Sequence, residues 1–280
     1  MSDNTQTSAA INKSNFEKVK EFNDAFQNYA LDSFTTETFE NEKSIVTLCL
    51  SLIKEELQEL KDAVEDNDHV EVRDALADIL YVTYGMQYRL GIQGDTCFDI
   101  LHLTNVKYIA KCCIKKNYAT SNLSNFEKVK QYNEIFKNKP FDSLTTEKLK
   151  NEKQDVFEYL SQIDELVQEL EEAVNDKNAG WVCDTLVSIL YTTYSMQYRL
   201  GIQGDSDFDI VHSSNMSKLC SSKEEAIKTV EWYTKEYNNG NKPYDTPYYF
   251  KVPELERWIV KNRSTGKVLK SINYTPVKWS

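Results

Sequence analysis

The sequence predicts an all-α protein in which two tandem copies of one helical unit form the body and a small α/β extension follows. The first observation is an internal repeat: residues 14–26 and 85–102 return at 124–136 and 195–212, always 110 positions later. The second is apolar spacing with a helical period of about 3.6 residues inside each copy. The third is a set of short aromatic and β-branched segments near the C-terminus.

The repeat favours a fused dimer, in which each copy takes the part of one subunit. The unit is too long for an ordinary solenoid repeat of roughly 20–50 residues. Two copies of a helical hairpin can instead bury their apolar faces in a single bundle, as an intrachain pseudo-dimer. The alternative is simple duplication for stability, and further self-association of the chain stays open.

The elements follow from these patterns in chain order. In the first copy, apolar spacing and turn residues predict helices over 16–26, from Thr36 or Glu37 to Val64, from Val72 to near Gly91, and from Asp95 toward Cys113. Asp66–Asn67–Asp68 supplies the turn between the second and third helices. The second copy repeats this order.

The domain boundaries are equally simple. We predict a polar tail over 1–12, a first copy over 13–116, a linker over 117–122, a second copy over 123–220 and the extension over 221–280. The extension begins with a helix capped by Ser222 and stopped at Gly240. Strands over 248–253, 258–262 and 267–272 follow, the last two joined by a turn at 264–266.

Composition excludes several classes of protein. A net charge of −11 argues against a nucleic-acid-binding protein, which usually carries a basic patch. The polar N-terminus indicates no signal peptide, and no apolar run approaches the roughly 20 residues that span a bilayer. The six scattered cysteines form no CxxC pair. A reducing, cytoplasmic location without membrane contact is the simplest interpretation.

An acidic motif is the strongest functional signal. Glu55, Glu56 and Glu59 share one face of the long helix, and Asp74 and Asp78 share a face of the next. Two antiparallel helices would bring these carboxylates together, where they repel each other unless a cation is bound. All-oxygen ligands suit Mg²⁺, or Mn²⁺. The glutamates alone fit a solvated helix face about equally well, but aspartates on a second, apolar helix favour a site.

The residues EELQE at 55–59, a turn, and DALADILYVTYG at 74–85 resemble the all-α nucleoside triphosphate pyrophosphohydrolases. That superfamily includes MazG proteins, dimeric dUTPases and phosphoribosyl-ATP pyrophosphohydrolases. The strongest resemblance is to phosphoribosyl-ATP-pyrophosphohydrolase-like proteins of phages and large DNA viruses. Their C-terminal segments are similar to residues 211–220 and 258–279 here.

The resemblance implies a helical-bundle dimer or tetramer that hydrolyses a nucleotide between its α- and β-phosphates. It places Glu56, Glu59 and Asp78 at the metal-ligand positions. Many relatives have ExxD on the second helix; Ala75 holds that glutamate position here, so Asp74 becomes the substitute ligand. One carboxylate free of the metal would act on the attacking water, with Glu55 or Glu59 as the candidate.

The two copies differ at the residues that matter most. The positions equivalent to Glu56 and Asp78 hold Leu166 and Ser188, so we expect weak Mg²⁺ binding by the second copy. The segment 211–220 resembles a phosphate- or nucleotide-binding motif, and the predicted substrate-binding residues are Asn105, His212, Asn215 and Lys218. The position equivalent to Lys218 holds Tyr108.

This asymmetry leaves two interpretations open: a composite site with phosphate contacts from the second copy, or a second copy that is decaying and only structural. His102 and His212 fit core residues better than metal ligands.

Together these features predict a Mg²⁺-dependent nucleoside triphosphate pyrophosphohydrolase with a house-cleaning or nucleotide-pool role, acting on NTPs or dNTPs. The alternative is a catalytically weakened nucleotide-binding or scaffold relative. A viral member would act in the host cytoplasm or the virion. Neither the base nor the sugar of the substrate follows from the sequence.

Overall fold

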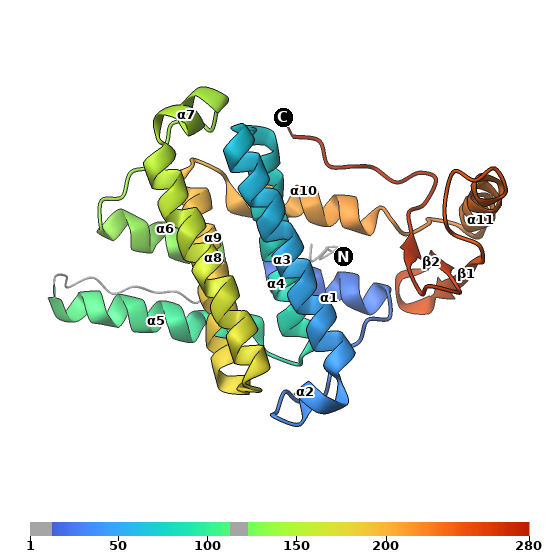
Figure 1. The fold of residues 1–280 in the computed structure, drawn as a ribbon, viewed down its shortest axis with the longest axis horizontal. Coiled ribbons are helices and arrows are strands. Elements are labelled where there is room, and N and C mark those ends of the chain that lie inside the picture. Colours follow the sequence, from blue (N-terminus) through green and yellow to red (C-terminus); the bar gives the residue numbers. More distant parts are fainter. Residues whose placement is uncertain (1–12, 113–122, 280) are drawn as a thin grey trace, which may run out of the picture.

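The computed structural model describes residues 13–112 and 123–279 and confirms the all-α body with a small C-terminal sheet (Figure 1). The first copy contains α1 Asn15–Ala25, α2 Thr38–Asn41, α3 Lys43–Asp66, α4 His69–Arg89 and α5 Gly94–Cys112. The second contains α6 Asn125–Ile135, α7 Thr146–Asn151, α8 Lys153–Asn175, α9 Ala179–Arg199 and α10 Gly204–Met216. The predicted tail over 1–12 and linker over 117–122 lie outside the described residues.

The predicted start of the long helix is wrong. The segment after Glu37 forms the separate short helix α2, and α3 begins only at Lys43. Glu42 interrupts the helix with φ −121° and ψ 31°. This bend lets Phe39 turn inward, where it is buried and packs against Phe34 with ring centroids 5.2 Å apart. Burial of one aromatic ring therefore outweighs the helical propensity of this stretch.

The turn between α3 and α4 forms as predicted and fixes the antiparallel hairpin that carries the acidic motif. Asn67 ends α3 in the left-handed region, with φ 55°. Asp68 then caps α4, because its side chain accepts hydrogen bonds from the backbone N–H groups of Val70 and Glu71. At the other end, Gly91 stops α4 with φ 75°, and a side chain there would meet the carbonyl oxygen of Leu31 at 2.4 Å. The hairpin is thus closed at both ends by local chemistry.

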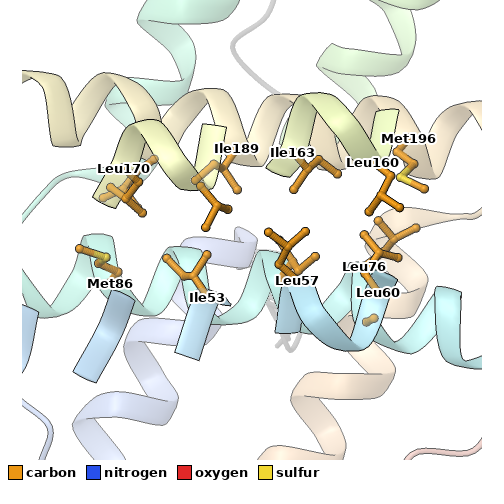
Figure 2. Packing of buried hydrophobic residues seen from close by; sticks show 14 of the residues in the cluster. Ile53, Leu57, Leu60, Leu76, Met86, Leu160, Ile163, Leu170, Ile189 and Met196 are labelled. Atoms are coloured by element: carbon orange, nitrogen blue, oxygen red, sulfur yellow. The ribbon is translucent and has the colours of Figure 1, made fainter. Parts of the chain in front are cut away.

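The core lies where the α3–α4 hairpin packs against the α8–α9 hairpin of the second copy (Figure 2). Ile53, Leu57 and Leu60 face Ile163 and Leu170 across this interface. Ion pairs at its edge join Lys54 to Glu171 and Lys61 to Asp164. The two copies share one core, so the chain folds as an intrachain pseudo-dimer.

Truncating this core should destabilise the whole molecule. Leu60 is fully buried between the hairpins, so Leu60→Ala removes apolar contacts and leaves a cavity. We expect it to lower the free energy of unfolding by about 3 kcal/mol. Urea denaturation measures this, with Leu52→Ala as the matched control because Leu52 lies on the same helix and is 36% exposed. Equal losses from both variants would contradict the shared core.

The last helix of each copy packs on the other copy. α10 lies against α1 and α4 of the first copy, whereas α5 lies against α6 and α9 of the second. The two helices extend in opposite directions from the bundle (Figure 1). At the centre of the bundle the hydroxyls of Tyr84 and Tyr194 are 3.1 Å apart. Asn15 donates to Tyr194 at 2.9 Å and Asn125 donates to Tyr84 at 2.8 Å, so buried hydrogen bonds join the two copies there.

The extension contains α11 Lys223–Asn238 and an antiparallel sheet of β1 Pro247–Val252, β2 Arg257–Asn262 and β3 Val268–Leu269, with a short 3-10 turn at Pro253–Leu255. The three strands appear in the predicted order, although β3 is shorter than expected. Backbone hydrogen bonds between Cys220 and Trp258 tie the sheet to the end of the second copy. The chain beyond the sheet runs back across the bundle toward α3 and α4 (Figure 1).

Across the two described stretches of the chain, every helix is too short or too polar to cross a bilayer.

Candidate metal and nucleotide site

The α3–α4 hairpin brings together the five acidic residues that the sequence singles out. Glu55 and Glu59 are exposed on α3, and Glu56 between them is partly buried. Asp74 and Asp78 are partly buried on α4. Lys61, which a solvated glutamate face would use as a counter-charge, instead pairs with Asp164 of the second copy at 2.6 Å.

Two of these carboxyl groups have strongly perturbed titration. Burial raises the pKa of Glu56 to about 8, and repulsion from Asp78, Glu59, Glu55 and Asp74 adds to the rise. Burial also raises the pKa of Asp78 to about 7, reinforced by the charge of Asp74. These carboxylates therefore destabilise each other when both are ionised, as acids gathered for a shared cation do.

The metal-free protein should consequently lose stability as pH rises. The folded-state pKa values of Glu56 and Asp78 lie above their ordinary values of 4.5 and 3.8, so the native state holds more protons than the unfolded state between those limits. The stabilisation is present at pH 4 and is lost as pH rises through 7 to 8. Thermal unfolding in EDTA from pH 5 to pH 9 measures this. A Glu56→Gln variant with an unchanged slope would contradict the assignment.

A lysine from the second copy lies within electrostatic range of the acids. Lys218 interacts electrostatically with Asp78 and Glu56, and its Nζ donates to Oδ1 of Asn215 at 2.7 Å. α10 ends at Met216, so Lys218 lies just beyond the helix that carries His212 and Asn215. Asn215 and Lys218 nevertheless share a contact, so the chain presents an amide and an ammonium group in the region of the carboxylates.

Tyr81 joins the acidic cluster to α10. Its hydroxyl lies 3.1 Å from Nδ1 of His212 and also hydrogen-bonds Asn215, and its ring stacks on Phe208 with centroids 5.4 Å apart. The nearby charge of Asp78, together with burial, raises the pKa of Tyr81. His212 thus contacts Tyr81, and its Nε2 lies 3.6 Å from a carboxylate oxygen of Glu21 on α1, rather than contacting the acids of the α3–α4 hairpin.

The donor set matches the chemistry of a hard divalent cation. Its oxygens are all carboxylate, several are partly buried, and their mutual repulsion calls for positive charge. As the side chains stand, no three His, Cys, Asp or Glu residues among 13–112 and 123–279 are close enough together to hold a metal ion. Holding a cation would therefore require the carboxylates to turn toward one another.

Comparison with known proteins places the chain among relatives. A family model described as phosphoribosyl-ATP pyrophosphohydrolase matches residues 19–105, which span the α3–α4 hairpin. An uncharacterized protein of Acanthamoeba polyphaga mimivirus is 34% identical over 271 residues, covering 97% of this chain and 95% of its own. The chain belongs to the phosphoribosyl-ATP pyrophosphohydrolase family. It therefore has the fold of nucleotide pyrophosphohydrolases, and its whole length is shared with a viral relative. No solved structure was found to match it.

The second copy of this family unit lacks the acidic cluster. Leu166 packs against the shared core, and the hydroxyl of Ser188 donates to the carbonyl oxygen of Asp184, one turn earlier. Asp184 itself is exposed, in contrast to the partly buried Asp74. The position of Glu56 has thus become part of the core, and that of Asp78 makes a local helix contact.

Asn105 does not join the site that the sequence suggests. It hydrogen-bonds Tyr191 and lines a cavity of about 700 Å³ in the second copy, away from the first copy's acids. The cause is the exchange of last helices, which places α5 on the second copy and α10 on the first. His102 accompanies it as a fully buried residue 3.3 Å from the Tyr191 hydroxyl. Asn105 therefore lies apart from His212, Asn215 and Lys218, and its role in substrate binding stays a prediction.

Trp279 contacts the acidic residues, and sequence reasoning missed it. Its indole Nε1–H donates to Oδ1 of Asp74 at 3.2 Å. The two residues are 205 positions apart, so no helical spacing could have paired them.

Proposed function

We propose that the chain is a Mg²⁺-dependent nucleoside triphosphate pyrophosphohydrolase with one working site, built from the first copy's acids and the second copy's α10 region. The observation that supports it most is that Lys218 of the second copy lies within electrostatic range of Asp78 and Glu56 of the first. A carboxylate cluster that can bind a cation and an ammonium group that can bind phosphate thus lie in one region of the molecule. Family membership supports the reaction class.

In this proposal, Glu56, Glu59, Asp74 and Asp78 hold Mg²⁺, and Mn²⁺ suits the same oxygens. The bound cation would neutralise phosphate charge and the charge that develops in the transition state. Lys218 binds a phosphate oxygen through its Nζ, as a point charge. Asn215 holds that ammonium group through the contact at 2.7 Å and so limits where the phosphate sits.

Of the two candidates Glu55 and Glu59, the arrangement favours Glu55 as the group that acts on water. Both are open to solvent, but only Glu55 lies outside the proposed ligand set. A free carboxylate there accepts a proton from the attacking water and orients its oxygen. The products are a nucleoside monophosphate and pyrophosphate, which fits a house-cleaning or nucleotide-pool role.

The experiment is pyrophosphate release from a panel of NTPs and dNTPs, with Mg²⁺ and with EDTA. We expect release from at least one nucleotide, dependent on the metal. A second candidate, a nucleotide-binding relative with weakened chemistry, is favoured by the loose spacing of the carboxylates. A folded protein that binds nucleotides but releases no pyrophosphate would establish that candidate instead.

A further inference from the structure

The end of the chain reaches the acidic cluster through a connected set of contacts. Besides donating to Asp74, the Trp279 ring lies under the guanidinium of Arg73, whose central carbon is 4.6 Å from the ring centroid. Arg73 in turn donates twice to the fully buried carboxylate of Asp207 on α10, at 2.5 and 2.6 Å. Arg73 thus holds the face of the indole, and the hydrogen bond to Asp74 holds its edge.

The tail that delivers Trp279 is anchored along α10. Tyr274 meets Ser214 through their hydroxyls at 3.1 Å, and the N–H of Thr275 donates to Ser217 at 2.9 Å. Val277 and Trp279 then pack against the buried cluster around Tyr81. Ordering a segment that has no helix or strand costs conformational entropy, which such contacts offset. These anchors therefore hold residues 274–279 in one defined place.

The second copy has no counterpart to this arrangement. The positions equivalent to Arg73 and Asp207 hold Cys183 and Cys97. The aspartate equivalent to Asp74, Asp184, is exposed. Residues 274–279 therefore contact only one acidic aspartate of the pair, Asp74 in the first copy.

We propose that Trp279 is a positioning residue for Asp74, orienting its carboxylate for the divalent cation; this inference rests on the proposed function. The indole has a single donor, so its hydrogen bond engages Oδ1, restrains where the carboxylate can turn and leaves Oδ2 for the cation. Such outer contacts orient metal-binding carboxylates and set metal affinity.

The test replaces the indole donor and keeps an aromatic ring. Trp279→Phe can still lie under Arg73 but cannot donate to Asp74. Mn²⁺ binding to the full chain, titrated by electron paramagnetic resonance, should weaken about 10-fold. Trp232→Phe is the matched control, because Trp232 lies on α11 and is 41% exposed, and it should bind Mn²⁺ as the wild type does. Unchanged Mn²⁺ affinity in Trp279→Phe would overturn the proposal.

A double-mutant cycle separates positioning from general stability. In an Asp74→Asn background, Trp279→Phe should cause no further loss of Mn²⁺ affinity, because the oriented carboxylate is already gone. Equal losses in both backgrounds would overturn the positioning role. Asp78→Asn shows whether a negative result counts against the role of Trp279 or against the proposed function. If it abolishes Mn²⁺ binding while Trp279→Phe does not weaken it, only this inference fails. If the wild type binds no Mn²⁺, the proposed function fails and the positioning role falls with it.

Discussion

Asp78→Asn should reduce pyrophosphate release by about 1000-fold, on the scale seen when a charge-stabilising group is removed from an active site. Asp78 sits between buried residues of α4, and its carboxylate interacts with Asp74, Glu59 and Lys218. Asparagine keeps the shape but removes the negative charge that a cation needs. Initial rates with saturating Mg²⁺ and the best nucleotide of the panel measure the effect.

The repeat supplies the control for this variant. Asp184→Asn makes the same chemical change at an aspartate of the second copy, on the exposed face of α9. We expect rates close to those of the wild type, because the partners equivalent to Glu56 and Asp78 are Leu166 and Ser188. Comparable losses from both variants would contradict a single working site.

Lys218→Met should lower kcat/KM by about 100-fold, which corresponds to about 2.7 kcal/mol of transition-state stabilisation. Methionine keeps most of the apolar stem, so the change isolates the ammonium group. That group lies within electrostatic range of Asp78 and Glu56 although it belongs to the other copy. Steady-state kinetics with Mg²⁺ measure the loss, and the same chain should keep its thermal stability within a few degrees.

Lys270→Met is the matched control, since Lys270 is exposed and its charge acts on Lys218 from nearby. It removes one positive charge from the same region without touching the acids, so the kinetic constants should change little. Full activity in Lys218→Met would mean that the second copy supports the site only structurally. Equal losses of kcat/KM in both lysine variants would indicate that the electrostatic potential of the region matters, and not a direct contact between Lys218 and phosphate.

Loss of the second acidic cluster has a physical advantage. In the first copy, burial and mutual repulsion hold the pKa of Glu56 near 8, so its ionised form destabilises the fold. Leu166 at the equivalent position adds to the shared core instead. A fused dimer with one acidic cluster therefore avoids a second set of mutually repelling carboxylates, while α10 still packs on the first copy.

Much of the fold follows from the sequence because local rules decide it. The repeat, the helical period and the turn at Asn67 each act over a few residues, and the structure agrees with them. The error at residues 36–42 arises where burial of Phe39 overrides local helix propensity. Boundaries of this kind depend on a partner from another part of the chain.

The candidate site can be predicted only in part, because some of its contacts also join distant parts of the chain. The acids on α3 and α4 come together because one short turn joins their helices. Lys218 and Asn105 depend on the exchange of last helices, which no spacing reveals. Trp279 depends on the path of the whole extension. One signal was available: the second copy has Lys218 where the first has Tyr108, whereas only the first copy has Glu56 and Asp78, and an exchanged helix would produce this split.

A crystal structure with Mn²⁺ and an α,β-methylene nucleoside triphosphate, recorded at an energy where manganese scatters anomalously, tests the central claim most directly. Our account predicts anomalous density between α3 and α4 of the first copy, at Glu56, Glu59, Asp74 and Asp78, with the phosphates reaching Lys218. It predicts none between α8 and α9. Manganese at the second copy, or phosphates bound away from Lys218, would contradict it.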